Sequence, residues 1–166
     1  LNGFSKAYAM TGWRIGFIAA PQWIVKGCNK LQGQYTSGPC SVSQKAAEAA
    51  YTLPQDCVET MRQAFERRRD LIVSLAKEIP GLEVNKPEGA FYLFPKCSSF
   101  FGKTDGQRTI NNSTDFAMYL LEVGHVATVG GDAFGDPDCF RMSYATSDDN
   151  IKEAMSRIKN ALSLLK

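Results

Sequence analysis

Two basic side chains near the start of the chain, Lys6 and Arg14, are the first candidates for chemistry. They lie in the stretch GFSKAYAMTGWRIG, positions 3–16. An uncharged lysine amine forms Schiff bases with carbonyl groups, and the guanidinium fork of arginine suits a phosphate dianion. Small residues surround the lysine, so a flat ligand could approach the backbone closely; they are Gly3, Ser5, Ala7 and Ala9. The stretch therefore predicts a site for a flat ligand that carries a carbonyl and a phosphate.

Pyridoxal 5′-phosphate (PLP) is a cofactor with these two groups. The same fourteen residues resemble the PLP attachment signature of the class I and II aminotransferases. The resemblance implies that Lys6 carries the cofactor as a Schiff base and that Arg14 binds its phosphate. Ser5, directly before the lysine, is a further candidate cofactor ligand, whereas Gly3 stands where some members have a phosphate-binding serine. The alternative is a pair of solvated charges, the usual state of Lys and Arg.

A second group of candidates lies in GGDAFGDPDCFRMSYATS, positions 130–147. Arg141 falls in an apolar strand, and a buried arginine needs an anionic partner. That partner could be a structural carboxylate within the chain. The block also resembles the G-x-x-F-G loop and F-R-[ML]-S-Y-A-T-S strand of the same family, which implies that Arg141 holds the substrate α-carboxylate through a two-point salt bridge. Tyr144 is interpreted as packing, and Gly130 stands where relatives commonly have proline.

The resemblance implies an aminotransferase most like the aspartate aminotransferase branch. Such an enzyme moves an amino group between an amino acid, here expected to be aspartate, and a 2-oxo acid, with Lys6 as general base and acid. It also implies a homodimer, in which the loop at positions 35–41 approaches the partner subunit's active site; a plain surface loop is the alternative. Two alternatives stay open: another PLP reaction on this scaffold, such as elimination or aminocyclopropane-carboxylate synthesis, and a non-catalytic folding or dimerisation module.

Composition excludes several other classes of function. The net charge of +2 over 166 residues is too small to indicate nucleic acid or an anionic membrane as a partner. No apolar run approaches the roughly 20 residues of a membrane span. Five cysteines, an odd number with no C-x-x-C spacing, indicate reduced thiols in a cytoplasmic protein and no metal site or disulfide framework. The only histidine, His125, follows a glycine in a turn, which argues against His-dependent catalytic triads.

We expect α/β and α+β parts: the end of the large mixed-sheet domain and the small α+β domain of the fold type I PLP-dependent enzymes. Leu1 stands five residues before Lys6, where no domain should begin, so we expect the C-terminal part of a longer enzyme. Residues 1–70 should belong to the large PLP-binding domain and residues 71–166 to the small C-terminal domain. The boundary, near Leu71, should lie inside one long helix.

Periodicity and breakers predict the elements that position these residues. Helices are expected at 22–34, 43–51, 54–79 and 113–122, the last capped by Ser113, and from Asp148 to the end. Strands are expected at 13–20, 82–84, 90–94, 126–129 and 140–145. The aromatic residues of the strand at 90–94 should form sheet core, although this segment passes near the active-site mouth in the family. The basic run at 67–69 should be solvated or salt-bridged, because Glu66 and Asp70 flank it. The loop at 97–112 has no phosphate-binding glycine motif.

Overall fold

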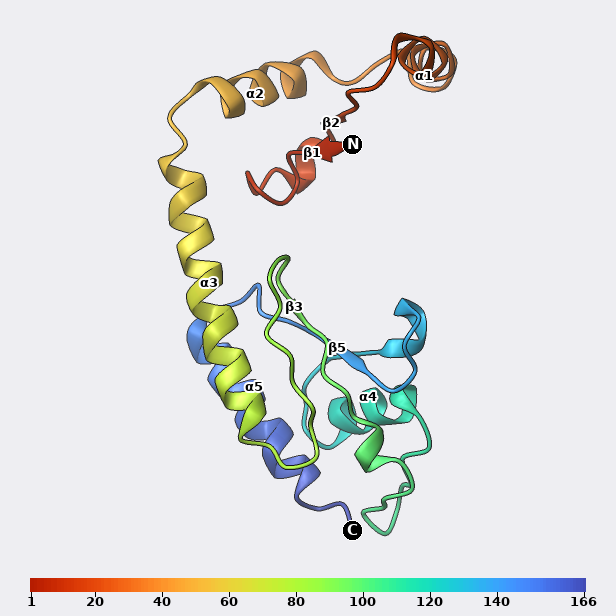
Figure 1. The fold of residues 1–166 in the computed structure, drawn as a ribbon, viewed down its shortest axis with the longest axis vertical. Coiled ribbons are helices and arrows are strands. Elements are labelled where there is room, and N and C mark those ends of the chain that lie inside the picture. Colours follow the sequence, from red (N-terminus) through yellow and green to blue (C-terminus); the bar gives the residue numbers. More distant parts are fainter. The chain divides into compact units, whose positions relative to one another are not determined.

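The structure, a computed structural model, describes residues 1–166 (Figure 1). The chain divides into two units, Leu1–Arg62 and Gln63–Lys166. This division falls inside helix α3 (Asp56–Lys77), as does the boundary expected near Leu71. The assignment of residues 1–70 and 71–166 to a large and a small domain stays a prediction.

The first unit is mainly helical, with two short strands. Helices α1 (Gln22–Tyr35) and α2 (Ser41–Thr52) precede the start of α3, in agreement with the predicted helices. Strands β1 (Asn2–Gly3) and β2 (Gly16–Phe17) pair with each other and with no other strand. The strand expected at 13–20 is therefore mostly wrong, because Thr11–Trp13 forms a 3₁₀ turn and Arg14 adopts a left-handed conformation.

The first unit buries little of its apolar surface. Its core consists of Phe4, Met10 and Ala47 with a few partly buried neighbours. Helix α1 buries no side chain, and Trp23, Leu31 and Tyr35 along it are 76%, 63% and 84% exposed. Exposed apolar surface on this scale is typical of surfaces that other protein covers.

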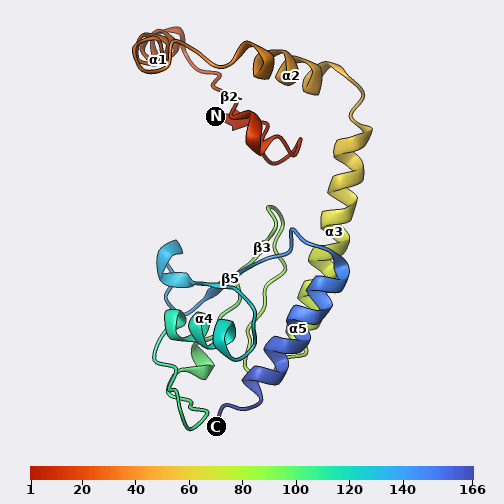
Figure 2. The ribbon, with the colours of Figure 1, turned by 180° about the vertical axis from the view of Figure 1, so that it is seen from behind.

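The second unit packs helices on a three-stranded antiparallel sheet in the order β3–β5–β4. The strands are β3 (Tyr92–Leu93), β4 (Val129–Gly130) and β5 (Phe140–Ser143). The helices are α4 (Ser113–Glu122) and α5 (Asp148–Leu162), together with the part of α3 from Gln63 onward. Helix α5 runs beside this part of α3 in both views of the ribbon (Figure 2).

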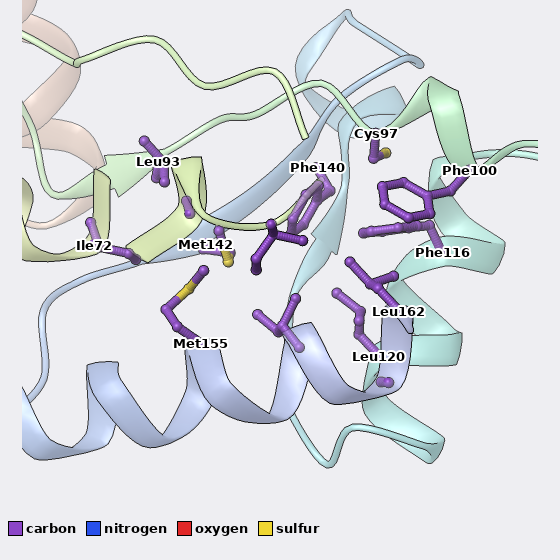
Figure 3. Close-up of a cluster of buried hydrophobic side chains, with 14 of the residues drawn as sticks. Ile72, Leu93, Cys97, Phe100, Phe116, Leu120, Phe140, Met142, Met155 and Leu162 are labelled. Carbon is purple, nitrogen blue, oxygen red and sulfur yellow. The ribbon is translucent and has the colours of Figure 1, made fainter. Parts of the chain in front are cut away.

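Alternation along β5 explains where the core of the second unit lies. Phe140 and Met142 are buried, whereas Arg141 and Ser143, which point to the other face of the sheet, are not. Phe140 packs against Phe116 of α4 at a ring-centroid distance of 4.8 Å. Met142 of β5 and Met155 of α5 belong to the same buried cluster (Figure 3). The apolar face of α5 is buried as predicted, at Ile151, Met155, Ile158, Ala161 and Leu162.

The strands of the second unit are shorter than expected. Ala90 has a left-handed φ of 59°, so β3 begins only at Tyr92. Of the strand expected at 82–84, only Glu83 forms a bridge, to Lys96. Of the strand expected at 126–129, only Val129 pairs. The positive φ of His125 confirms the predicted turn before this segment.

The cap of α4 differs by one residue from the prediction. The side chain of Asn112, and not that of Ser113, accepts the N–H of Asp115 at 2.8 Å. Ser113 is fully buried, and its Oγ accepts the N–H of Gly131 at 3.1 Å. Ser113 therefore ties the start of α4 to the segment that follows β4.

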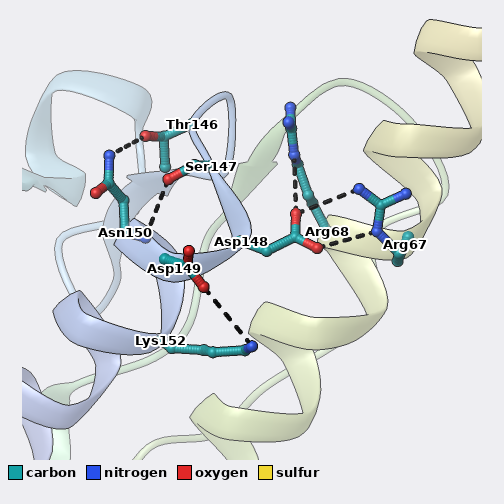
Figure 4. Close-up of polar contacts among 8 residues, drawn as sticks. All are labelled: Arg67, Arg68, Thr146, Ser147, Asp148, Asp149, Asn150 and Lys152. Carbon is teal, nitrogen blue, oxygen red and sulfur yellow. Dashed lines mark hydrogen bonds and ion pairs between the residues drawn. The ribbon is translucent and has the colours of Figure 1, made fainter.

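The basic run of α3 is salt-bridged, as predicted. Arg67 and Arg68 both contact the carboxylate of Asp148, at 3.0 and 3.2 Å (Figure 4). The hydrogen bond from Arg67, followed by the contact with Arg68, holds the pKa of Asp148 below its ordinary value. Arg69 pairs with Asp70 at 2.9 Å. Because Asp148 opens α5, these contacts join α3 to α5 within the second unit.

Candidate active site

The loop that carries Lys6 is closed by the pairing of β1 with β2. Gly3 stands opposite Gly16 and Asn2 opposite Phe17. A Cβ atom at Gly16 would lie 3.0 Å from the carbonyl oxygen of Asn2, so a side chain there would push the two strands apart. The pairing brings Ser5, Lys6 and Arg14 into one closed loop.

Phe4 anchors the lysine side of this loop. Its ring is buried and packs against Tyr8 and Tyr51, and its carbonyl accepts the N–H groups of Tyr8 and Met10. Lys6 lies on the resulting turn, where its carbonyl accepts the N–H of Ala9 at 3.2 Å. The backbone at Lys6 is thus fixed, while its side chain is exposed.

Arg14 has an unusual backbone conformation, with φ 50° and ψ 53°. A non-glycine residue in this region costs about 1–3 kcal/mol, so the surroundings must impose it. Nη1 of Arg14 donates to the carbonyl of Thr11 at 3.0 Å, and the hydroxyl of Thr11 donates to the carbonyl of Ser5 at 3.0 Å. This chain of hydrogen bonds links the arginine end of the loop to the residue before Lys6.

The charged residues in and near this loop in the sequence are all basic. Residues 1–47 contain five Lys or Arg and no Asp or Glu, and Glu48 is the first acidic residue. Within this basic stretch of sequence, Lys6 and Arg14 are both exposed and belong to the same loop. The assignment of Lys6 and Arg14 to a ligand with a carbonyl and a phosphate stays a prediction.

Arg141 occupies the central strand of the second unit, on the face opposite the core. Its guanidinium carbon lies 4.4 Å from the ring centroid of Tyr92 and 4.0 Å from that of Phe134. No carboxylate contacts it, so the structural ion pair considered as an alternative is not seen. Arg141 is half-buried against two aromatic rings, with its charge not neutralised.

The prediction that the aromatic residues of the strand at 90–94 form sheet core is only partly right. Leu93 is fully buried, but Phe91, Tyr92 and Phe94 are half-buried. Tyr92 pairs with Ser143, which shares a face of β5 with Arg141. The register therefore brings Tyr92 to Arg141, a contact that sequence reasoning missed. The packing interpretation of Tyr144 is confirmed: it is 1% exposed, and its hydroxyl donates to the carbonyl of Ala90.

The structure thus groups three of the four predicted site residues. Ser5, Lys6 and Arg14 lie in one loop of the first unit, and Arg141 lies in the second unit. A hollow of about 500 Å³, lined by His125, Arg157 and others, contains none of them. No helix has the length and apolar character needed to cross a membrane.

Comparison with known proteins gives one consistent family. Residues 1–158 match the family model described as aminotransferase class I and II. A bifunctional aspartate aminotransferase and glutamate/aspartate-prephenate aminotransferase of Petunia hybrida is 50% identical over 170 residues, which cover 100% of this chain and 36% of the relative. An aspartate aminotransferase of Rhizobium meliloti (strain 1021) is 49% identical, over 97% of this chain and 40% of the relative.

Similar solved structures belong to the same family. The crystal structure of the aspartate aminotransferase from Rhizobium meliloti matches 99% of this chain and 41% of its own, with a TM-score of 0.95 and 48% identity. An aromatic aminotransferase from Pyrococcus horikoshii OT3 matches 97% of this chain and 42% of its own, with a TM-score of 0.85 and 39% identity. The chain therefore spans about two fifths of the length of these relatives, and it has the fold of the matching part of fold type I aminotransferases.

Proposed function

Because this chain belongs to the class I and II aminotransferase family, we propose that, within a complete enzyme, it transfers an amino group between aspartate and a 2-oxo acid. The observation that carries the proposal is the loop that contains both Lys6 and Arg14 and that the pairing of β1 with β2 closes. The aminotransferase names of the relatives support the same reaction.

The family is PLP-dependent, and the loop offers the groups that this cofactor needs. Lys6 would hold the aldehyde, and Arg14, with Ser5, would hold the phosphate. When bound, PLP supplies an electron sink for the carbanion that forms at the substrate Cα. The backbone hydrogen bonds to Phe4 and the bond from the Thr11 hydroxyl to the carbonyl of Ser5 would help to hold the shape of this loop.

The chain's own residues then have separate tasks. Once the substrate amine has displaced it from the cofactor aldehyde, the freed Lys6 amine would take the proton from the substrate Cα and pass it on, acting first as general base and then as general acid. Arg141 binds the α-carboxylate through two parallel N–H···O bonds. Because one carbon carries both the amine and the carboxylate of the substrate, Lys6 Nζ and the Arg141 guanidinium should lie roughly 6–10 Å apart in a closed complete enzyme.

Aspartate is proposed as the amino donor because two of the most similar relatives are named for it. The name of the Petunia relative also includes prephenate. Prephenate is therefore the second 2-oxo acid to test, beside 2-oxoglutarate. Product analysis with labelled aspartate would separate transamination from elimination or ring-closing chemistry on the same scaffold.

We also expect a homodimer. Helix α1 and the loop at 35–41 expose large apolar side chains, among them Trp23 and Tyr35, which the remaining domain or a partner subunit would cover. Sedimentation of the complete protein tests this expectation, and a monomer at all concentrations would contradict it. The free state of all five cysteines supports a cytoplasmic location, where thiols stay reduced.

The decisive experiment labels the lysine. PLP is titrated into the complete protein, the absorbance of the bound cofactor is followed, and borohydride reduction with peptide mapping then identifies the attached residue. We expect the label on Lys6 and no stable label in the Lys6→Arg variant. A label confined to Lys26, Lys30 or Lys45 would refute the proposed site. Residues 1–166 alone should show no more than trace transamination, because the partner of the cofactor's pyridine nitrogen is expected elsewhere in a complete enzyme.

A further inference from the structure

The surroundings of Arg141 contain a feature that substrate binding alone does not explain. Two rings from different segments, Tyr92 of β3 and Phe134 at the end of a short 3₁₀ helix (Gly131–Phe134), lie against one guanidinium. Each ring has its own aromatic support. Phe91 packs on Tyr92 with a centroid distance of 4.6 Å, and Phe94 packs edge-on against Phe134 at 6.1 Å.

The pairing of the strands explains why these two rings lie against Arg141. Tyr92 stands opposite Ser143, so it is the diagonal neighbour of Arg141 on the same face of the sheet. Phe134 follows β4, which pairs with β5 at Arg141 itself through Val129. Segments on both sides of β5 therefore each contribute one ring to the same guanidinium.

Aromatic faces differ from carboxylates as partners for an arginine. They attract the cation through the ring quadrupole but carry no net charge. They also accept none of the five in-plane N–H groups, which stay available for a fork-shaped contact with a carboxylate. A carboxylate partner from the chain would instead compete with the substrate.

We propose that Tyr92 and Phe134 are positioning residues, which hold the Arg141 guanidinium between their rings so that its N–H edge receives the substrate α-carboxylate. This inference rests on the proposed function. Neither ring touches the reacting atoms; both act through Arg141. Loss of either ring leaves the charge in place but frees the guanidinium to adopt other rotamers, so substrate binding weakens more than the chemical step.

The test compares Tyr92→Leu and Phe134→Leu with Tyr92→Phe and Phe134→Tyr in the complete PLP-bound enzyme. Each leucine variant should raise the KM for aspartate about three- to tenfold, with kcat changed less than about twofold. The dissociation constant of succinate, which does not react, should rise in parallel. The ring-preserving variants should stay within about twofold of the wild type, which separates loss of the ring from general damage.

β-Alanine serves as the control substrate, because it is aspartate without the α-carboxylate. Its half-reaction should be equally fast in the leucine variants and the wild type. If the leucine variants slow both substrates equally, or leave the KM for aspartate unchanged, the positioning role is wrong. Arg141→Leu separates the role of the two rings from the role of Arg141: if this variant also affects both substrates equally, the substrate role of Arg141 in the proposed function fails. If only Arg141→Leu selects against aspartate, the proposed function stands and the role of the two rings fails.

Discussion

Gly131 permits the sharpest prediction about the second unit, because a side chain there has no space. A Cβ atom at this position would lie 2.0 Å from the carbonyl oxygen of Asp136 and 2.3 Å from that of Cys139. Both contacts are with backbone, so no side-chain rotation can relieve them. Substitution Gly131→Ala must therefore displace the segment between β4 and β5.

The expected loss of stability follows from the hydrogen bonds and the packing that this displacement disrupts. To bring the closer contact from 2.0 to 3.0 Å, the shortest distance that Cβ atoms tolerate, the chain must move by about 1 Å. The N–H of Gly131 donates to the carbonyl of Cys139 at 2.8 Å and to Ser113 Oγ at 3.1 Å, and both bonds would be lost. Two hydrogen bonds at about 1 kcal/mol each and about 1–3 kcal/mol of packing strain give a loss of about 3–5 kcal/mol.

Urea unfolding followed by far-UV circular dichroism measures this loss in the complete protein. Gly89→Ala is the matched control, because nothing lies within 4 Å of its Cβ position and its φ is not in the left-handed region. The control should change the free energy of unfolding by no more than about 0.5 kcal/mol. Equal stability of the two variants would refute the reasoning and show that the segment can adopt another path at little cost.

Three further predictions concern other contacts of the second unit. Asp148→Asn removes both ion pairs with the arginines of α3; since these pairs lower the pKa of Asp148, their contribution is present above its ordinary value of 3.8 and is lost as the pH falls through the native value. The urea midpoints of variant and wild type should therefore differ at neutral pH and converge in acid, and a constant difference would contradict the linkage. Burial raises the pKa of Cys97 to about 12 and that of Cys139 to about 11, so a disulfide reagent at mildly alkaline pH should modify these two thiols only after unfolding, and rapid modification of the native protein would be the contrary result. Asn112→Ala should cost about 1 kcal/mol in urea unfolding, whereas Asn112→Ser, which keeps a capping oxygen, should cost less.

The helices were predictable because their signals are local. Pro54 and the Pro80–Gly81 pair bracket α3, and the predicted limits at 54 and 79 lie within two residues of the observed Asp56 and Lys77. The limits of the strands were not predictable in this way, since strand length depends on the pairing partner and on single backbone angles. The left-handed conformation of Ala90 shortens β3, and nothing in its side chain indicates that conformation.

The cap of α4 shows the same limit on a smaller scale. Asn112 and Ser113 are both good capping residues, so local preference does not choose between them. Ser113 instead bonds the N–H of Gly131, which lies far along the chain. A long-range partner thus decides a local question, and only the folded structure shows that partner.

The candidate site likewise has one part that the local sequence predicts and one part that depends on long-range strand pairing. A contiguous motif carries Lys6 and Arg14, and the pairing of β1 with β2 then closes their loop. The aromatic partners of Arg141, by contrast, come from the register of three strands.

That register also resolves the apparent conflict of an arginine in an apolar strand. Side chains alternate along β5, so the arrangement that buries Phe140 and Met142 necessarily turns Arg141 to the opposite face. Two backbone hydrogen bonds to the segment around β3 help to fix this choice: the N–H of Phe140 donates to the carbonyl of Pro95, and the N–H of Tyr144 donates to that of Phe91. A slip by one residue would place the guanidinium among the core side chains and Met142 against the two rings. Core packing therefore selects the face of the sheet on which Arg141 keeps its charge available to an anionic ligand, and stability and the proposed substrate contact depend on the same alternation.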